Sequence, residues 1–215
     1  FGRQQQHATA RRHHARQLEG ERRTARVVVR TRRAPGLGAA LQVERIHVAA
    51  DEQEVIGISG SRMVPGGVYV DNGVLIDDTE GGRAPVMDLR DVASLPGSHN
   101  WQNAAAAFAA CKAIGVDTPV IAACLRSFPG LTHRQQIVAV IDGVAFINDS
   151  KATNADAAAM ALACYDKIHW IAGGRAKEGG LAGLEPYYGR IAHAFLIGEA
   201  AEDFAAVLQD RVPVS

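Results

Sequence analysis

The chain has 215 residues, 47% of them hydrophobic, which is enough for one large domain or two modest ones. Its formal charge is zero, so the whole chain is no polycation, and no apolar run approaches the roughly 18 residues of a membrane span. Cys111, Cys124 and Cys164 show no CxxC pair and no metal-ligand spacing. They indicate neither a disulfide framework nor a zinc site, and they fit a reducing cytoplasm.

Residues 1–50 differ from the rest of the chain. They contain 11 arginines, no lysine and three glutamates, and the arginines follow neither a helical nor a strand period. Such a composition is typical of disorder, and a shifted reading frame of GC-rich DNA gives it too. A basic arm that binds nucleic acid is the other interpretation. We expect a segment that is disordered or not native to the fold that follows.

Residues 51–129 form the first predicted domain, in which antiparallel strands precede two helices. Apolar runs separated by turns fill residues 55–89, and Asn72-Gly73 is a strong hairpin signal. Alanine-rich sequence predicts a helix at residues 100–114, and a second helix is expected at 119–127.

Residues 130–215 form the second predicted domain, after a boundary marked by Pro129 and Gly130. The expected elements are a hairpin of strands at 137–141 and 144–147 turning at Asp142-Gly143, a helix at 152–164, strands at 168–172 and 192–197, and a helix at 199–208. Strands that alternate with helices favour a parallel α/β sheet.

Polar residues follow one of these strands in the sequence NDSKATN, residues 148–154. Ligands of open α/β sheets bind outside the carboxyl ends of strands, so this stretch is a candidate site. Asp149 or Ser150 can cap the following helix, whose free N–H groups then face an anion. The helix dipole disfavours Lys151 in a first turn unless an anionic ligand binds there. A plain cap with a solvated lysine explains the same residues equally well.

Three other polar stretches carry weaker signals. GGRAKEGG, residues 173–180, is a glycine loop with two cations, and a flexible surface turn is its simpler interpretation. Asn100 and Asn103 lie on one face of a predicted helix, where N-terminal capping is the commoner use of Asn. Arg134 follows the domain boundary, and its guanidinium suits a phosphate or carboxylate, although most arginines beside loops are solvated.

Taken together, LPGSHNWQNAAAAFAA, GLTHRQQ, FINDSKATNADA and AGGRAKEGG, in this order and spacing, resemble the Mur ligases. NDSKATN resembles in particular the members that add D-glutamate. The resemblance runs from about Pro65 to Arg190, fades toward Ser215 and is absent before residue 50. It implies an α/β fold, with a remnant of the central ATPase domain, made of antiparallel strands and helices, followed by a truncated Rossmann-like C-terminal domain.

The same resemblance implies a cytoplasmic, ATP-dependent amide ligase of peptidoglycan synthesis, with ATP and Mg²⁺ as cofactors. ATP phosphorylates the carboxylate of UDP-N-acetylmuramoyl-L-alanine, and the amine of D-glutamate attacks the acyl phosphate. No membrane or nucleic-acid partner and no metal ligand in this chain is expected. The site residues that the resemblance assigns are Asn100 and Asn103 near the adenine, Asp149 at the ribose, Arg134 and Lys151 as catalytic cations on the phosphate side, and Thr153 and Lys177 at the D-glutamate carboxylates.

Some family features have no counterpart in this sequence. It contains no GxxxxGK[ST] loop and no lysine before Lys112, and Gln136 stands where many members have Glu. We therefore expect a catalytically inactive fragment. Two alternatives stay open, another Mur-superfamily ligase such as a folylpolyglutamate synthase, and a non-enzymatic nucleic-acid-binding module that uses residues 1–50. NDSKATN argues against the first, and the scarcity of aromatic residues in that segment argues against the second.

Overall fold

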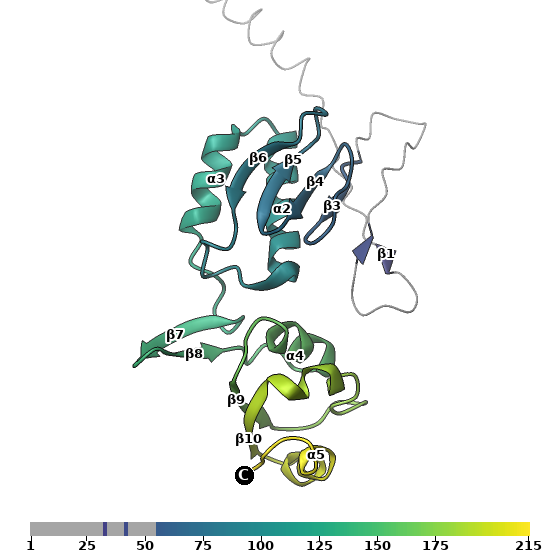
Figure 1. Cartoon of the computed structure of the whole chain (residues 1–215), viewed down its shortest axis with the longest axis vertical. Coiled ribbons are helices and arrows are strands. Elements are labelled where there is room, and N and C mark those ends of the chain that lie inside the picture. The colour runs from purple at the N-terminus through teal and green to yellow at the C-terminus, as the bar shows by residue number, and fades with distance from the viewer. Residues whose placement is uncertain (1–31, 34–40, 43–54) are drawn as a thin grey trace, which may run out of the picture.

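The computed structural model describes residues 32–33, 41–42 and 55–215, which form a mixed α/β structure (Figure 1). Strands β1 (Arg32–Arg33) and β2 (Leu41–Gln42) pair antiparallel. The rest of the arginine-rich segment lies outside the described residues, so the expectation for residues 1–50 stays a prediction.

A four-stranded sheet forms the centre of the first half. Its order is β3 (Ile58–Ser59), β4 (Val68–Asp71), β5 (Val74–Asp77) and β6 (Ala84–Asp88). The pairs β4–β5 and β5–β6 are antiparallel, as expected, but β3 and β4 are parallel. The prediction of antiparallel strands is wrong for that pair, because residues 60–67 carry the chain back to the end at which β3 began.

The two predicted helices are present, and both pack against this sheet. Helix α2 (Gly97–Ala113) contacts β3 and β4, and α3 (Thr118–Ser127) contacts β6 (Figure 1). Helix α2 begins three residues earlier than expected, directly after Pro96, whose backbone is extended. The core between sheet and helices includes the fully buried side chains of Leu75 and Phe108.

The second half begins with a hairpin of β7 (Gln136–Ile141) and β8 (Val144–Asn148). After it come helix α4 (Ala155–Leu162), strand β9 (Ile168–Gly173), the 3₁₀ helix η1 (Glu185–Arg190), strand β10 (Ile191–Ile197) and helix α5 (Ala201–Leu208). Strands β9 and β10 are parallel, as expected, although a 3₁₀ helix rather than an α-helix lies between them, and Val214 forms a further parallel bridge to Ala194.

Both predicted hairpin turns are present. Asn72 and Gly73 have φ angles of 46° and 84°, and Asp142 and Gly143 have φ angles of 49° and 80°. Two successive residues with positive φ define the tight turn that matches the twist of antiparallel strands, and this explains the Asn-Gly and Asp-Gly pairs.

Two separate hydrophobic cores stabilise the described residues. The first contains buried residues between Ile56 and Ala122, and the second contains buried residues between Ala159 and Val212. This separation supports a boundary near residue 129, which stays a prediction. No helix in the described part of the chain is long and apolar enough to cross a membrane.

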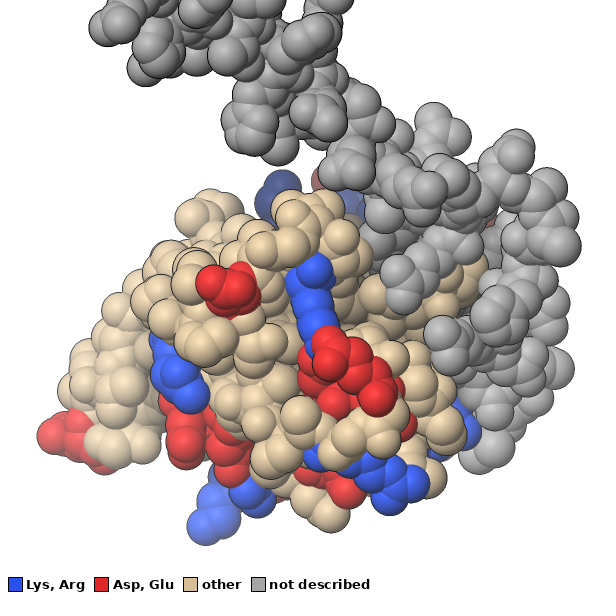
Figure 2. All heavy atoms as spheres, turned by 90° about the horizontal axis from the view of Figure 1, so that it is seen from above, with Lys and Arg blue, Asp and Glu red and all other residues tan. Residues whose placement is uncertain are grey.

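Figure 2 shows the face seen from above Figure 1, where Lys and Arg side chains are interspersed with Asp and Glu side chains. Over the described residues of this face, neither sign forms a continuous patch. Most of the arginine-rich segment, on which the nucleic-acid alternative depends, lies outside the described residues.

Candidate functional site

The NDSKATN stretch forms a loop after β8 that contacts the linker before β7. The amide Nδ2 of Asn148 lies 3.1 Å from Nδ1 of His133, and the backbone N–H of Lys151 donates to the carbonyl of His133 at 3.1 Å. Two of the four motifs, GLTHRQQ and NDSKATN, therefore lie side by side.

The predicted helix cap is wrong. Helix α4 begins at Ala155, not near Ala152, because Asn154 has an extended backbone and its side chain accepts a hydrogen bond from the N–H of Ala157 at 2.8 Å. Neither Asp149 nor Ser150 caps it, and Lys151 lies in the turn before the helix. The argument from the helix dipole for an anion at Lys151 therefore does not hold. The side chain of Lys151 is exposed.

Asp149 is held by the linker instead. Its carboxylate Oδ1 accepts a hydrogen bond from the backbone N–H of Gln135 at 3.0 Å. Burial raises the pKa of Asp149, and this hydrogen bond together with the charges of His99 and Arg134 opposes that rise. Each of these three groups favours the ionised carboxylate, which is the form that accepts hydrogen bonds.

Thr153 and Lys177, both assigned to the D-glutamate carboxylates, lie together. The ammonium Nζ of Lys177 donates to Oγ1 of Thr153 at 3.3 Å. Thr153 belongs to the loop after β8 and Lys177 to the glycine loop after β9, so the ends of two strands meet here. Gly173 allows this loop to start close to β10, because a Cβ at that position would lie 1.8 Å from the carbonyl oxygen of Ile197.

The cations of the candidate site differ in their partners. Arg175 forms two hydrogen bonds to the carboxylate of Glu199, at 3.0 and 3.2 Å, although both side chains are exposed. Arg134 and Lys151 are exposed and form no ion pair within the described residues. The charge of Arg134 acts on the nearby Asp149 carboxylate, that of Lys151 has no such partner among the described residues, and that of Arg175 is balanced by Glu199.

Helix α2 carries the two predicted adenine-side residues. The amide Nδ2 of Asn100 donates to the carbonyl of Pro96 at 2.8 Å, and Asn103 is exposed. Because α2 starts at Gly97, neither Asn is an N-cap, so the simpler interpretation of both residues is wrong. The start of α2 also approaches the second half, since a Cβ on Gly97 would lie 2.4 Å from Sγ of Cys164.

Two residues of this junction were missed by sequence reasoning. The ring Nε2 of His99 lies 3.1 Å from Nε2 of Gln135, and Gln135 also contacts Asp149. No periodic pattern predicts that a glutamine in a linker is buried. The available signal was the position of each residue, one before Asn100 and one after Arg134.

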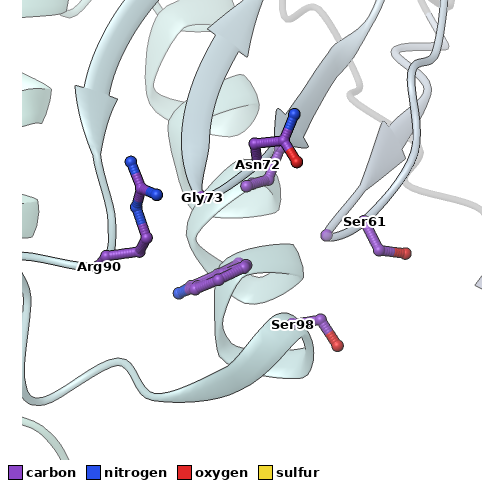
Figure 3. Close-up of a pocket in the computed structure, with 8 residues that line it drawn as sticks. Ser61, Asn72, Gly73, Arg90 and Ser98 are labelled. Atoms are coloured by element: carbon purple, nitrogen blue, oxygen red, sulfur yellow. The ribbon is translucent and has the colours of Figure 1, made fainter.

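A shallow pocket of about 350 Å³ lies beside the first turn of α2 (Figure 3). It contains none of the predicted site residues, and Figure 3 shows Arg90 on one side of it and Ser61 and Ser98 on the other. Its lining residues are Gly60, Ser61, Val70, Asn72, Gly73, Arg90, Ser98 and Trp101.

The described residues also include no group of three or more His, Cys, Asp or Glu side chains that could hold a metal ion. Mg²⁺ is usually held through one or two carboxylates together with substrate phosphates and waters, so a site for it does not require such a group.

No protein-family model matches the chain, but individual curated proteins do. It is 54% identical to a protein of Rhodospirillum rubrum over 163 residues, 52% identical to one of Rhizobium johnstonii over 175, and 47% identical to one of Agrobacterium fabrum over 193. Each of the three is named UDP-N-acetylmuramoylalanine--D-glutamate ligase.

These matches cover 76%, 81% and 86% of this chain, and 34%, 37% and 41% of the relatives. The chain thus spans little more than a third of the length of these relatives. The match to the Agrobacterium fabrum protein covers 86% of this chain, a larger share than residues 51–215 represent. It therefore extends into the first 50 residues, farther than expected. Over the matched residues, the chain belongs to the D-glutamate-adding ligases of the Mur ligase family.

Proposed function

We propose that this chain is part of an ATP-dependent ligase that joins D-glutamate to UDP-N-acetylmuramoyl-L-alanine in peptidoglycan synthesis. The names of relatives that are 47–54% identical to it support this activity. The observation that carries the proposal is the hydrogen bond from Lys177 to Thr153, which brings the NDSKATN loop and the glycine loop together.

Within this proposal, residues of the junction bind the nucleotide. The carboxylate of Asp149 accepts hydrogen bonds from the ribose hydroxyls, and the amides of Asn100 and Asn103 contact the adenine. Arg134 and Lys151, which are exposed and form no ion pair among the described residues, stabilise negative charge on the phosphate side as the phosphoryl group is transferred.

Residues of the two loops bind the amino acid. A carboxylate of D-glutamate accepts hydrogen bonds from the Lys177 ammonium and the Thr153 hydroxyl, which already lie within hydrogen-bonding distance of each other. The ion pair between Arg175 and Glu199 leaves Lys177 as the cation of that loop available to this ligand.

ATP supplies the phosphoryl group that activates the carboxylate of the muramoyl substrate. Mg²⁺ belongs to the proposal through the resemblance alone, held through the nucleotide phosphates rather than by a cluster in the described residues. A cytoplasmic location follows from the same source, and the free thiols of Cys111, Cys124 and Cys164 are in keeping with it.

The proposal also covers the architecture. Residues 51–129 are the end of the central ATP-binding domain, and residues 130–215 are most of a Rossmann-like domain. The two separate cores and the parallel pair of β9 and β10 support this division. Neither the folylpolyglutamate synthase nor the nucleic-acid-binding alternative is supported by the names of the relatives.

A chimeric enzyme tests the activity. The matching third of the Rhodospirillum rubrum ligase is replaced by this chain, and phosphate release is measured with ATP, D-glutamate and UDP-N-acetylmuramoyl-L-alanine. We expect release that depends on all three substrates, and Lys151→Ala is expected to lower kcat about 100-fold, the scale of losing one electrostatic group at a reacting centre.

Lys167→Ala is the matched control, because Lys167 is also exposed but lies in the turn before β9. It is expected to leave kcat within about twofold of the unsubstituted chimera, as an exposed residue outside the site should. A chimera that folds but releases no phosphate, or one in which Lys151→Ala keeps full activity, would contradict the proposal.

A further inference from the structure

Gln135 is a buried polar residue in the linker that joins the two halves. It is 7% exposed, although the four residues directly before it, 131–134, are exposed. Its φ angle of 44° lies in the left-handed region, which residues other than glycine adopt rarely and at a cost in free energy. Such a conformation persists where surrounding contacts offset the cost, so the contacts of Gln135 decide what it does.

Those contacts reach both halves of the molecule. The backbone N–H of Gln135 donates to Oδ1 of Asp149 at 3.0 Å, just after β8. The side-chain Nε2 of Gln135 lies 3.1 Å from Nε2 of His99, in the first turn of α2. One residue therefore connects the proposed ribose contact to the turn that carries Asn100.

The direction of the second hydrogen bond follows from the state of His99. Burial lowers the pKa of His99, and the nearby Asp149 opposes that shift in part, so the imidazole is neutral near pH 7. A neutral imidazole has one donor and one acceptor nitrogen. The amide nitrogen of Gln135 faces Nε2 of His99, and it donates to this atom in the Nδ1–H tautomer of the ring.

The other polar atom of the side chain is not used. Oε1 of Gln135 is buried and accepts no hydrogen bond from the described residues. The thiol of Cys164 donates to the carbonyl of Met160 at 3.0 Å, and a side-chain hydrogen bond with Gln135 opposes the rise that burial causes in the pKa of this thiol. A methionine of similar length would fill this space without an unpaired oxygen. Packing alone therefore does not explain the glutamine, whereas the contacts of its polar side chain with His99 and Cys164 do.

We propose that Gln135 is a positioning residue of the nucleotide site, which holds the Asp149 carboxylate at a fixed place relative to the first turn of α2. Its backbone N–H orients the carboxylate, and its side-chain amide fixes the linker against His99. Asp149 at the ribose then keeps a fixed position relative to the residues on α2 that contact the adenine. This inference rests on the proposed function, because it assigns ATP to the junction.

One substitution can separate the two contacts of Gln135, the backbone hydrogen bond to Asp149 and the side-chain contact with His99. Gln135→Met keeps the backbone N–H and the side-chain volume but removes the donor to His99. If Gln135 acts through Asp149, this substitution weakens only ligands that use Asp149. ATP has the ribose hydroxyls that Asp149 would bind, and 2′,3′-dideoxy-ATP lacks them.

Binding of both nucleotides to the 215-residue chain is therefore measured by calorimetry, in the wild type and in Gln135→Met. We expect the substitution to weaken ATP binding about fivefold to tenfold, the effect of one hydrogen bond, and to leave dideoxy-ATP binding unchanged. The control Gln209→Met makes the same chemical change at an exposed position after α5 and is expected to alter neither affinity.

Nitrogen-15 NMR of the His99 ring provides a readout that needs no nucleotide. The wild type is expected to show the Nδ1–H tautomer, and Gln135→Met a shift toward Nε2–H. If Gln135→Met does not fold, Gln135→Glu replaces it. A carboxylate facing His99 is expected to raise the pKa of that ring and to weaken the binding of ATP but not that of dideoxy-ATP.

The outcomes distinguish this inference from the proposed function. A wild-type chain that binds no ATP would overturn the proposed function and, with it, this role of Gln135. Detectable ATP binding with unchanged His99 signals in both variants would overturn the inference alone. Equal losses for ATP and dideoxy-ATP would show a general structural role, and would overturn it as well.

Discussion

The hairpins β4–β5 and β7–β8 share one kind of turn but differ in burial. Val68 and Val70 of β4 are 0% and 1% exposed, whereas Val138 and Val140 of β7 are 62% and 64% exposed. Each hairpin turns at a residue pair with positive φ, Asn-Gly in the first and Asp-Gly in the second. The same local signal therefore forms both hairpins, whatever packs against them.

The difference lies in the neighbouring layer. Helix α2 packs on β3 and β4, whereas β7 and β8 make their extensive contacts, among the described residues, with each other. Strands β9 and β10 are intermediate, since one face contributes to the second core and the other exposes Ile171 and Phe195. Hydrogen bonding and turn chemistry thus define a strand, and only an added layer makes it part of a core.

The largest expected effect is on the first core. Phe108→Ala removes a side chain with 0% exposure and should reduce the free energy of unfolding by about 3–5 kcal/mol. Phe146→Ala on β8, where Phe146 is 50% exposed, should cost less than about 1 kcal/mol. Urea unfolding measures both, and similar losses would contradict the contrast between the two regions.

The two tryptophans allow the regions to be followed separately. Trp101 packs against the first core and Trp170 against the second. In a Trp170→Phe background, the fluorescence of Trp101 should report a large shift of the transition on Phe108→Ala. In a Trp101→Phe background, the transition of Trp170 should shift less. Coincident shifts would mean that the two cores unfold as one unit.

The second prediction concerns an ion pair at the edge of the first region. Burial raises the pKa of Asp77, but hydrogen bonds from Lys112 and Thr79 outweigh it and hold the pKa below its usual value of 3.8. This carboxylate is 8% exposed, so Lys112→Met leaves it buried without its main partner. We expect a loss of about 1–3 kcal/mol near neutral pH, measured by urea unfolding.

The sign of the pH dependence sharpens this test. A carboxyl whose pKa is lowered on folding contributes stability above its unfolded pKa, and this stability is lost as the pH falls through the folded value. The difference between Lys112→Met and the wild type should therefore shrink as the pH is lowered below 3.8. A difference that stays constant would show that Lys112 acts through packing alone.

The contrast between the two hairpins also shows which parts of the fold could be predicted from the sequence. Both hairpins, both helices of the first half and the parallel pair β9–β10 depend on turn residues and apolar periods, and these were predicted. The start of α4 was not, because Asp149, Ser150 and Asn154 are all good caps by type. Only tertiary structure shows that Asp149 is used by Gln135, which leaves Asn154 as the cap.

The candidate site was found mainly through its resemblance to a family. Composition and spacing left the NDSKATN loop and the glycine loop ambiguous, and the structure then brought Thr153 to Lys177. It also paired Arg175 with a carboxylate, a distinction between two neighbouring cations that spacing does not contain. Gln135 stayed hidden, because a buried polar residue in a linker follows no period.

A third prediction tests the junction between the regions through pH. Burial holds the pKa of His99 below its usual value of 6.5, so the unfolded chain takes up a proton at a higher pH than the folded chain does. Stability should therefore fall as the pH is lowered from above 6.5 through the folded pKa.

Unfolding of His99→Gln measures this contribution, since the substitution should flatten the pH dependence. His169→Gln, on the exposed side of β9, should leave it in place. The raised pKa of Asp149 acts in the opposite sense, adding stability as the pH falls through its folded value toward 3.8. A wild-type chain whose stability rises between pH 7.5 and pH 5.5 would contradict the account of His99.

The smallest expected effect on stability separates the two hairpins most directly. Val→Thr exchanges a methyl group for a hydroxyl at nearly constant shape. Val70→Thr places that hydroxyl in the first core and should cost about 1–3 kcal/mol unless it finds a partner. Val140→Thr places it on an exposed strand and should change the free energy of unfolding by less than about 0.5 kcal/mol.

Exposed apolar strands favour association, so Val140→Thr should instead lower self-association in sedimentation velocity, whereas Val70→Thr should not. If Val140→Thr destabilised the chain as much as Val70→Thr, the β7–β8 hairpin would have to be covered in solution by a layer that the described residues do not supply.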